Sequence, residues 1–215
     1  MNSLGDIKAV IFDMDGVIVD SESLSVASEK AVLNKHGIVI DESDWGTFKG
    51  KTTSAIFSYV IKKYHVENVT VEQMINEKFF QYMEMFDKEI SIFPQFQELI
   101  NYLRPKYKIA LTTSSVKEMK DRILEKFDLE KYFDVIVTGD MVSNGKPHPE
   151  PYLLTLNKLG LQGSECVVVE DSDNGITSAK EAGIKTIAVT HTFPEEKLSH
   201  ADFIVDGLRD IISII

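Results

Sequence analysis

The sequence predicts an α/β fold: a doubly wound, Rossmann-like parallel-sheet core that carries an inserted all-helical block. Three observations predict it. Short apolar segments alternate with helical patterns through most of the 215 residues. Several of these segments are apolar at nearly every position, as in parallel strands covered on both faces. The alternation stops between about residues 21 and 92, where no convincing strand occurs.

Six segments have the length and composition of buried strands. Helical patterns separate most of them, so consecutive strands are expected to run parallel, joined by right-handed crossovers. The expected strands cover residues 9–13, 108–112, 135–138, 166–170, 186–189 and 203–205.

Three helices are expected between these strands. Ser115 and Glu118 have the spacing of a capping box, which predicts a helix from there to about Phe127. Shorter helices are expected over residues 151–159 and 175–182. Gly183 follows the second of these, where glycine commonly ends a helix.

The helical block is expected to form a cap subdomain. A structureless loop of this length would be improbable in a compact domain. Thr70 and Gln73 have the spacing of a second capping box. The core is therefore expected to comprise residues 1–20 and 93–215, and the cap residues 21–92, closing over a bound substrate. Apolar residues at helical spacing are Leu24, Ala27, Ala31 and Val32, then Ile56, Tyr59, Val60 and Tyr64, then Met74, Ile75, Phe79, Met83 and Phe86.

Composition narrows the classes of function. Apolar residues make up 43% of the chain, enough for a core domain with a smaller insertion. The formal net charge of −11 argues against nucleic acid as a partner, and no apolar run is long enough to span a membrane. The N-terminus lacks the regions of a signal peptide, and the lone Cys166 suits a reducing, cytoplasmic compartment. The oligomeric state is left open, and a capped domain of this kind could work as a monomer. Cys166 and Trp45 are expected to serve packing.

Polar side chains follow four of the expected strands at their carboxyl ends. In open α/β sheets this is the edge at which ligands bind. Carboxylates, hydroxyls and a lysine that converge there would suit a phosphate group and a divalent cation, so phosphoryl transfer is the leading hypothesis. The candidates are Asp13 and Asp15, then Thr113 and Ser114, then Lys146, and finally Glu170 and Asp171.

The two aspartates behind the first strand have different expected roles. Asp13 is the candidate nucleophile, which would attack phosphorus and form an aspartyl-phosphate. Asp15 is the candidate acid and base: it would protonate the leaving alkoxide and then activate water. Two aspartates can also belong to a simple turn, but the company of the other motifs favours the catalytic interpretation.

The remaining candidates are expected to bind phosphate and metal. Lys146 would neutralise the phosphate dianion, and Thr113 with Ser114 would hold its other oxygens. Mg²⁺ prefers carboxylate oxygens, which Asp13, Asp171 and Glu170 can supply. The expected partner is a small phosphorylated molecule.

Four segments resemble, in order and approximate spacing, the motifs of the haloacid dehalogenase superfamily. The resemblance covers nearly the whole chain, and the helical block is similar to that superfamily's α-helical cap. The β-phosphoglucomutase-like phosphatases are the subgroup it resembles. The resemblance implies a Mg²⁺-dependent phosphatase with Asp13 as nucleophile and Asp15 as acid and base, the latter reaching the metal through its backbone carbonyl. The segments are Asp13-Met14-Asp15-Gly16-Val17, Thr113-Ser114, Gly145-Lys146-Pro147 and Glu170-Asp171-Ser172.

Two positions depart from the pattern of the mutases in that subgroup. A histidine usually stands five residues beyond Asp20, where this chain has Ser25, and a cap arginine falls on Thr53. Lys49 and Lys51 are candidate substrate contacts, but neither offers the bidentate fork of arginine. Both departures favour hydrolysis of a phosphomonoester, such as a sugar phosphate. A phosphosugar mutase is the alternative, and a phospho-acceptor signalling module is a third hypothesis.

Overall fold

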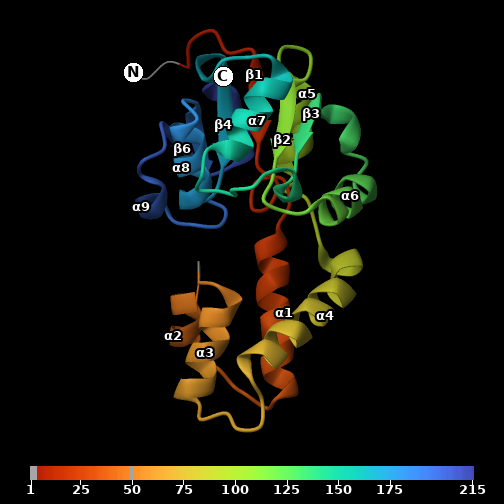
Figure 1. Ribbon diagram of the computed structural model, residues 1–215, viewed down its shortest axis with the longest axis vertical. Helices are drawn as coiled ribbons and strands as arrows, with labels where there is room; N and C mark the ends of the chain where they lie inside the picture. The colour runs from red at the N-terminus through yellow and green to blue at the C-terminus, as the bar shows by residue number, and fades with distance from the viewer. Residues whose placement is uncertain (1–3, 49–50) are drawn as a thin grey trace. The chain divides into compact units, whose positions relative to one another are not determined.

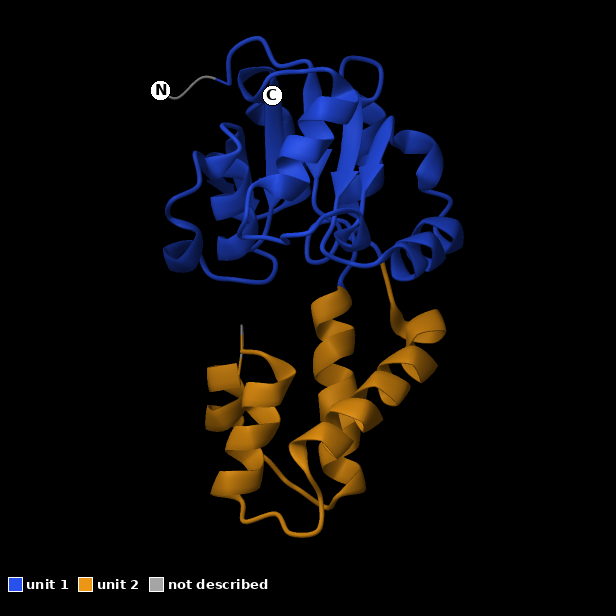
Figure 2. Ribbon diagram, viewed as in Figure 1, with its two compact units in different colours: residues 1–20, 92–215 blue, residues 21–91 orange. Residues whose placement is uncertain are grey.

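The computed structural model describes residues 4–48 and 51–215, which divide into two compact units (Figure 2). The first, called here the α/β unit, comprises Met1–Asp20 and Ile92–Ile215. The second, the helical unit, comprises Ser21–Ser91. The division expected from the sequence differs by one residue, because it assigns Ile92 to the helical block.

The α/β unit is built on a six-stranded, fully parallel sheet with the order β3-β2-β1-β4-β5-β6 (Figure 1). The central strands β1 and β4 are buried at every position, which explains why β1 is apolar throughout and β4 is apolar up to its last residue, Glu170. The predicted fold class is confirmed, with six strands at the six expected places. They are β1 Ala9–Phe12, β2 Lys108–Thr112, β3 Val135–Val137, β4 Cys166–Glu170, β5 Lys185–Val189 and β6 Phe203–Val205.

The register brings the ends of the central strands to one edge. Phe12, the last residue of β1, lies opposite Leu111 of β2 and Val169 of β4. The residues that follow each strand therefore emerge side by side. The strand order also reverses at β1, because β2 and β3 lie on one side of it and β4 to β6 on the other. Such a reversal is where doubly wound sheets bind ligands.

Alternate residues of β1 face two different layers of helices. Ala9 and Ile11 pack with Tyr152 of α7 in one buried cluster, whereas Phe12 meets Phe96 of α5 edge-on at 5.6 Å between ring centroids. The lone Cys166 is buried in the first of these clusters, as predicted. The helices of this unit are α5 Gln95–Leu103, α6 Lys117–Lys126, α7 Glu150–Leu159, α8 Asp173–Glu181 and α9 Glu195–Leu198. Short 3-10 turns cover Glu130–Tyr132, Gly139–Met141, Gly163–Glu165 and Leu208–Ser213.

One helix start in this unit differs from its prediction. The expected capping box at Ser115 does not form: α6 begins at Lys117, and its N-cap residue Val116 provides no side-chain hydrogen bond. Asp140 takes over the role, because its Oδ1 accepts a hydrogen bond from the Lys117 backbone N–H at 2.9 Å. The predicted end of a different helix, α8, is confirmed, since Gly183 follows that helix with φ +76°.

The helical unit has a separate apolar core. Its helices are α1 Ser21–Lys35, α2 Glu42–Phe48, α3 Thr53–Lys63 and α4 Val71–Glu89. Thr70 and Gln73 form the predicted capping box at the start of α4. Trp45 packs against this core, as predicted. The expected apolar face of α4 is partly wrong, because Phe79 is 59% exposed, whereas Met74 and Phe86 are buried.

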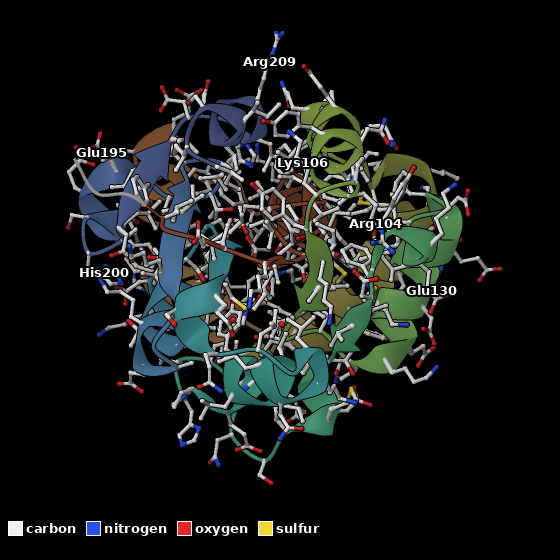
Figure 3. All side chains as sticks on the ribbon, turned by 90° about the horizontal axis from the view of Figure 1, so that it is seen from above. Arg104, Lys106, Glu130, Glu195, His200 and Arg209 are labelled. Carbon is white, nitrogen blue, oxygen red and sulfur yellow. The ribbon has the colours of Figure 1, made fainter. Side chains whose placement is uncertain are left out.

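Charged side chains cover the outside of the α/β unit. Arg104, Glu195 and Arg209 are exposed, and Glu195 and Arg209 extend away from the ribbon (Figure 3). Arg104 also joins two elements, because it pairs at 2.9 Å with Asp134, just before β3. Among the described residues, no helix combines the length and apolar character that crossing a membrane requires.

Candidate functional site

A cleft of about 230 Å³ lies at the carboxyl edge of the sheet, next to the reversal point between β1 and β4. It lies entirely within the α/β unit. The predicted site residues that line it together come from four different loops. The lining residues are Asp13, Asp15, Ser114, Lys146, Glu170, Asp171 and Ser172.

The Lys146 ammonium group joins three segments of this cleft. Its Nζ donates to Asp13 Oδ1 at 2.7 Å, to Glu170 Oε1 at 2.6 Å and to the Thr112 carbonyl oxygen at 3.0 Å. The ring of Tyr152 lies beneath the same nitrogen, with 4.9 Å between Nζ and the ring centroid. Lys146 therefore fixes one oxygen of the candidate nucleophile and balances part of the negative charge around it.

Glu170 is the most completely hydrogen-bonded carboxylate of the cleft. Its Oε1 accepts from Lys146 and from the Tyr152 hydroxyl at 2.9 Å. Its Oε2 accepts from the backbone N–H groups of Asp171 and Ser172 and from the Ser172 hydroxyl. Five donors fill the roughly four lone-pair positions that a carboxylate offers. Glu170 is thus placed to orient its neighbours, and it has little capacity left for a further partner.

Burial and neighbouring charges shift the pKa values of Asp13, Asp171 and Lys146. Burial raises the pKa of Asp13 well above its usual range, the Lys146 charge opposes the rise, and nearby Glu170 and Asp171 add to it. Burial, with help from Glu170, likewise raises the pKa of Asp171 to about 7. Burial alone would lower the pKa of Lys146, but Asp13 and Glu170 outweigh it and raise that pKa well above 10.5.

These carboxylates fit a hard divalent cation. Oxygens of Asp13, Glu170 and Asp171 lie within 4.8 Å of one another, and all three residues are buried. A single cation among the described residues, Lys146, faces these three carboxylates, so the cluster has an excess of negative charge. Carboxylate oxygens are the ligands that Mg²⁺ prefers. Because Glu170 is already saturated, Asp13 and Asp171 have the freer oxygens.

Two glycines make the close approach of these loops possible. Gly16 has φ +76°, and a Cβ built there would lie 1.8 Å from Asp171 Oδ2. A Cβ at Gly175 would lie 1.9 Å from the Glu170 carboxyl carbon. Each position therefore excludes any side chain, and Gly16 also needs the left-handed conformation.

The run of hydroxyl residues after β2 is divided between different tasks. Ser114 is exposed and lines the cleft, whereas Thr113 is buried and is not among the lining residues. The Thr113 Oγ1 accepts a hydrogen bond from the Ser115 backbone N–H at 3.0 Å. Ser115 donates its hydroxyl to Asp15 Oδ2 at 2.8 Å. Ser114 is thus the hydroxyl of this run that is open to a phosphate.

The two positions that depart from the mutase pattern meet inside the helical unit. Lys78 Nζ donates to Ser25 Oγ and to Thr53 Oγ1, at 2.8 Å each. It also forms an ion pair with buried Glu29 at 2.8 Å. The predicted substrate contact Lys49 lies outside the described residues. Lys51 lies over the rings of Phe48 and Tyr59, at 5.9 and 5.6 Å from their centroids.

Sequence reasoning missed two residues that shape the cleft, Tyr152 and Thr192, and the contact that Ser115 makes there. Tyr152 lies six residues beyond Lys146 on α7, and nothing local marks it as a partner of Glu170. Thr192, beyond β5, hydrogen-bonds Asp171 through its side chain. Ser115 has the local signature of a helix cap, which conceals its contact with Asp15. Only the rule that loops at the carboxyl edge of a sheet converge could have flagged the loop after β5.

Comparison with known proteins shows the family of this chain. The sequence model of the haloacid dehalogenase-like hydrolases matches residues 10–189. A phosphorylated carbohydrates phosphatase of Thermotoga maritima is 34% identical over 88% of this chain and 88% of its own length. A phosphoglycolate phosphatase of Salmonella paratyphi A is 28% identical over 99% of this chain and 94% of its own.

Solved structures give the same result. The crystal structure of a candidate β-phosphoglucomutase from Thermotoga maritima superimposes with a TM-score of 0.83 at 32% identity, covering 97% of this chain and 98% of that one. The match to the sequence model covers the helical unit and the sheet from β1 to β5. The chain therefore belongs to the haloacid dehalogenase-like hydrolase family.

Proposed function

We propose that the protein is a Mg²⁺-dependent phosphatase of small phosphorylated metabolites, and that it acts through an aspartyl-phosphate on Asp13. The observation that carries the proposal is the buried contact between Lys146 and Asp13 at 2.7 Å, in a cleft that also holds Asp15 and Asp171. Membership of a hydrolase family argues against the phospho-acceptor signalling module.

The first step transfers the phosphoryl group from the substrate to the protein. The free oxygen of Asp13 attacks phosphorus, a new P–O bond forms, and the ester P–O bond to the leaving oxygen breaks. Asp15 gives its proton to that oxygen, and the alcohol leaves. Lys146 holds the other oxygen of Asp13 and partly balances the charge of the phosphoryl group.

The second step returns the nucleophile. Asp15, now a carboxylate, takes a proton from water, whose oxygen attacks the phosphorus. The bond between phosphorus and Asp13 breaks, and inorganic phosphate leaves. General acid–base assistance of this kind contributes roughly 10²–10⁴-fold, so neutralisation of charge and positioning must supply the larger share of the rate.

Asp13 and Asp171, with the backbone carbonyl of Asp15, would hold the Mg²⁺ ion, and Glu170 would orient them. When bound, the ion supplies positive charge that offsets the phosphate oxygens and the crowded carboxylates. The clustering of the oxygens of Asp13 and Asp171 in the buried cleft supports this assignment.

The substrate class is supported by the relatives, which are named for phosphorylated carbohydrates and for phosphoglycolate. We infer a small sugar phosphate or a phosphorylated acid of similar size, and a cytoplasmic setting in keeping with the lone, buried Cys166.

A screen of phosphate release tests the proposal. The panel contains sugar phosphates, phosphoglycolate, glycerol phosphate, nucleotides and p-nitrophenyl phosphate, with the isosteric Asp13→Asn variant as the blank. Wild-type protein is expected to release phosphate with Mg²⁺ and to stop when EDTA is added. Phosphate release by Asp13→Asn at the wild-type rate would contradict the proposal.

A phosphosugar mutase is the second candidate, favoured by the similarity to the candidate β-phosphoglucomutase structure. The pairing of Lys78 with Ser25, Glu29 and Thr53 argues against it, since these groups satisfy one another. Incubation with a hexose 1-phosphate and a bisphosphate activator separates the two. The mutase would yield the isomeric hexose phosphate, whereas the phosphatase would yield free sugar and phosphate.

A further inference from the structure

The hydroxyl of Ser115 is directed toward the candidate acid and base of the cleft. Its Oγ donates to Asp15 Oδ2 at 2.8 Å, although one hundred residues separate the two in sequence. The local sequence would use this hydroxyl to cap α6. Asp140 caps that helix instead, by accepting from the Lys117 backbone N–H at 2.9 Å. The Ser115 side chain is thereby free to bind Asp15.

The backbone of Ser115 is fixed on both sides. Its N–H donates to Thr113 Oγ1 at 3.0 Å, and its carbonyl accepts from the Gly139 N–H at 2.9 Å. Gly139 admits no side chain, because a Cβ there would lie 2.2 Å from the Ser114 carbonyl oxygen. The loops after β2 and β3 thus lock together, and they set the point from which the hydroxyl reaches Asp15.

The two oxygens of Asp15 have different surroundings. Oδ2 is held by Ser115, whereas no described residue donates a hydrogen bond to Oδ1. The side chain is half-buried and lines the same cleft as Asp13. One oxygen is therefore anchored, and the other can exchange a proton with a reacting group.

We propose that Ser115 is a positioning residue for Asp15: it anchors one carboxylate oxygen so that the other meets the leaving oxygen of the substrate. This inference rests on the proposed function, in which Asp15 delivers the proton as the ester bond breaks. Misplacement of a catalytic group by about 1 Å can cost up to about 100-fold in rate, so a single anchoring hydrogen bond can matter.

The proposal predicts a dependence on the leaving group. An alkoxide, such as that of glycerol phosphate, is a strong base and needs the proton of Asp15 when it leaves. The p-nitrophenolate ion is a weak base and leaves without one. The two substrates share the nucleophile, Lys146 and the phosphoryl group, so they differ chiefly in their demand on Asp15.

The experiment compares kcat/KM for the two substrates, because kcat/KM covers the steps up to departure of the leaving group. Ser115→Ala is expected to lower kcat/KM about tenfold or more for glycerol phosphate and to change it by less than about twofold for p-nitrophenyl phosphate. Ser115→Thr keeps the hydroxyl and is expected to restore most of the loss. Ser199→Ala removes an exposed hydroxyl elsewhere in the α/β unit and is the matched control.

A double-mutant cycle completes the test. In an Asp15→Asn background, Ser115→Ala is expected to cause no further loss with glycerol phosphate. An equal loss for both substrates, or a full additional loss in that background, would overturn the proposal. If Asp15→Asn shows the dependence on the leaving group and Ser115→Ala does not, this inference alone fails. If kcat/KM of Asp15→Asn does not depend on the leaving group, the acid role of Asp15 in the proposed function fails, and this inference fails as well.

Discussion

At the scale of single residues, missing side chains shape the cleft as much as the groups that are present. Gly16 and Gly175 lie against the carboxylates of Asp171 and Glu170, in space that a Cβ would occupy. Glycine at the first turn of α8 costs helix stability, so its presence there reflects the need for room.

Replacement of Gly175 by alanine is expected to lower phosphatase activity at least about tenfold, because the new methyl group displaces Glu170 from Lys146 and Asp171. Steady-state kinetics with p-nitrophenyl phosphate measure the effect. Gly46→Ala is the matched control: this glycine also lies in a helix, and a Cβ added there would meet nothing among the described residues within 4 Å beyond its own helix backbone and its chain neighbours. That variant should keep full activity and gain about 0.5–1 kcal/mol. Full activity in Gly175→Ala would contradict the role given to Glu170.

Cys166 gives a prediction about pH. Burial, assisted by the nearby Glu165 charge, raises the pKa of its thiol from 9.0 to about 11. The folded state therefore keeps its proton between these values while the unfolded state loses it, and stability falls as pH rises through that window. The native thiol should resist iodoacetamide at pH 8. Urea unfolding of wild type and Cys166→Ala should diverge only between about pH 9 and 11; rapid native alkylation at pH 8 would refute the burial argument.

At the scale of elements, most of the fold could be predicted because strands and helices have local patterns. Short, mostly apolar segments mark all six strands, and the capping box at Thr70 forms as its sequence indicates. The same pattern failed at Ser115, since a distant Asp140 caps α6 and the serine hydroxyl binds Asp15. Long-range partners decide such cases, and a local pattern contains no information about them.

The ion pair between Lys78 and Glu29 is the polar centre of the helical unit. Lys78→Met leaves the buried Glu29 carboxylate unpaired, which is expected to cost about 3–5 kcal/mol. The double variant Lys78→Met/Glu29→Leu should recover most of that loss. Trp45, the only tryptophan of the chain, lies in this unit and reports its unfolding by fluorescence.

Lys62→Met is the control for this experiment, because Lys62 is an exposed lysine on α3 of the same unit. Its effect should stay within about 0.5 kcal/mol. A loss in Lys78→Met no larger than that of the control would show that the pair does not stabilise the unit.

At the scale of the whole molecule, an acidic protein concentrates its cation-binding capacity at one place. The net charge is −11, yet among the described residues only Asp13, Glu170 and Asp171 form a carboxylate cluster suited to a metal, at the sheet edge where β1 and β4 end. The cluster could be located from the sequence because acidic residues stand at the carboxyl ends of β1 and β4. The sequence could not show that Glu170 is the most fully hydrogen-bonded of these carboxylates, since that depends on Tyr152 and Ser172 donating to it.

Mg²⁺ is expected to raise the melting temperature of the chelated protein, because a ligand that binds only the folded state stabilises it. Saturation at about 100 times the dissociation constant corresponds to about 2.7 kcal/mol. Asp171→Asn should lose most of this shift, whereas Asp173→Asn, which changes an exposed carboxylate two residues away, should keep it. Equal shifts of the melting temperature in wild type and Asp171→Asn would show that Mg²⁺ binds elsewhere.

The central claim is that phosphate passes through Asp13, and trapping that intermediate tests it most directly. Asp15→Asn is mixed with p-nitrophenyl phosphate, whose leaving group needs no proton, and the reaction is quenched in acid at short times. Because this variant lacks the base for the second step, mass spectrometry of peptides should find a phosphoryl group on Asp13, in near-stoichiometric amount. Release of p-nitrophenolate with no phosphoryl group on Asp13, or with the group on another residue, would contradict the account.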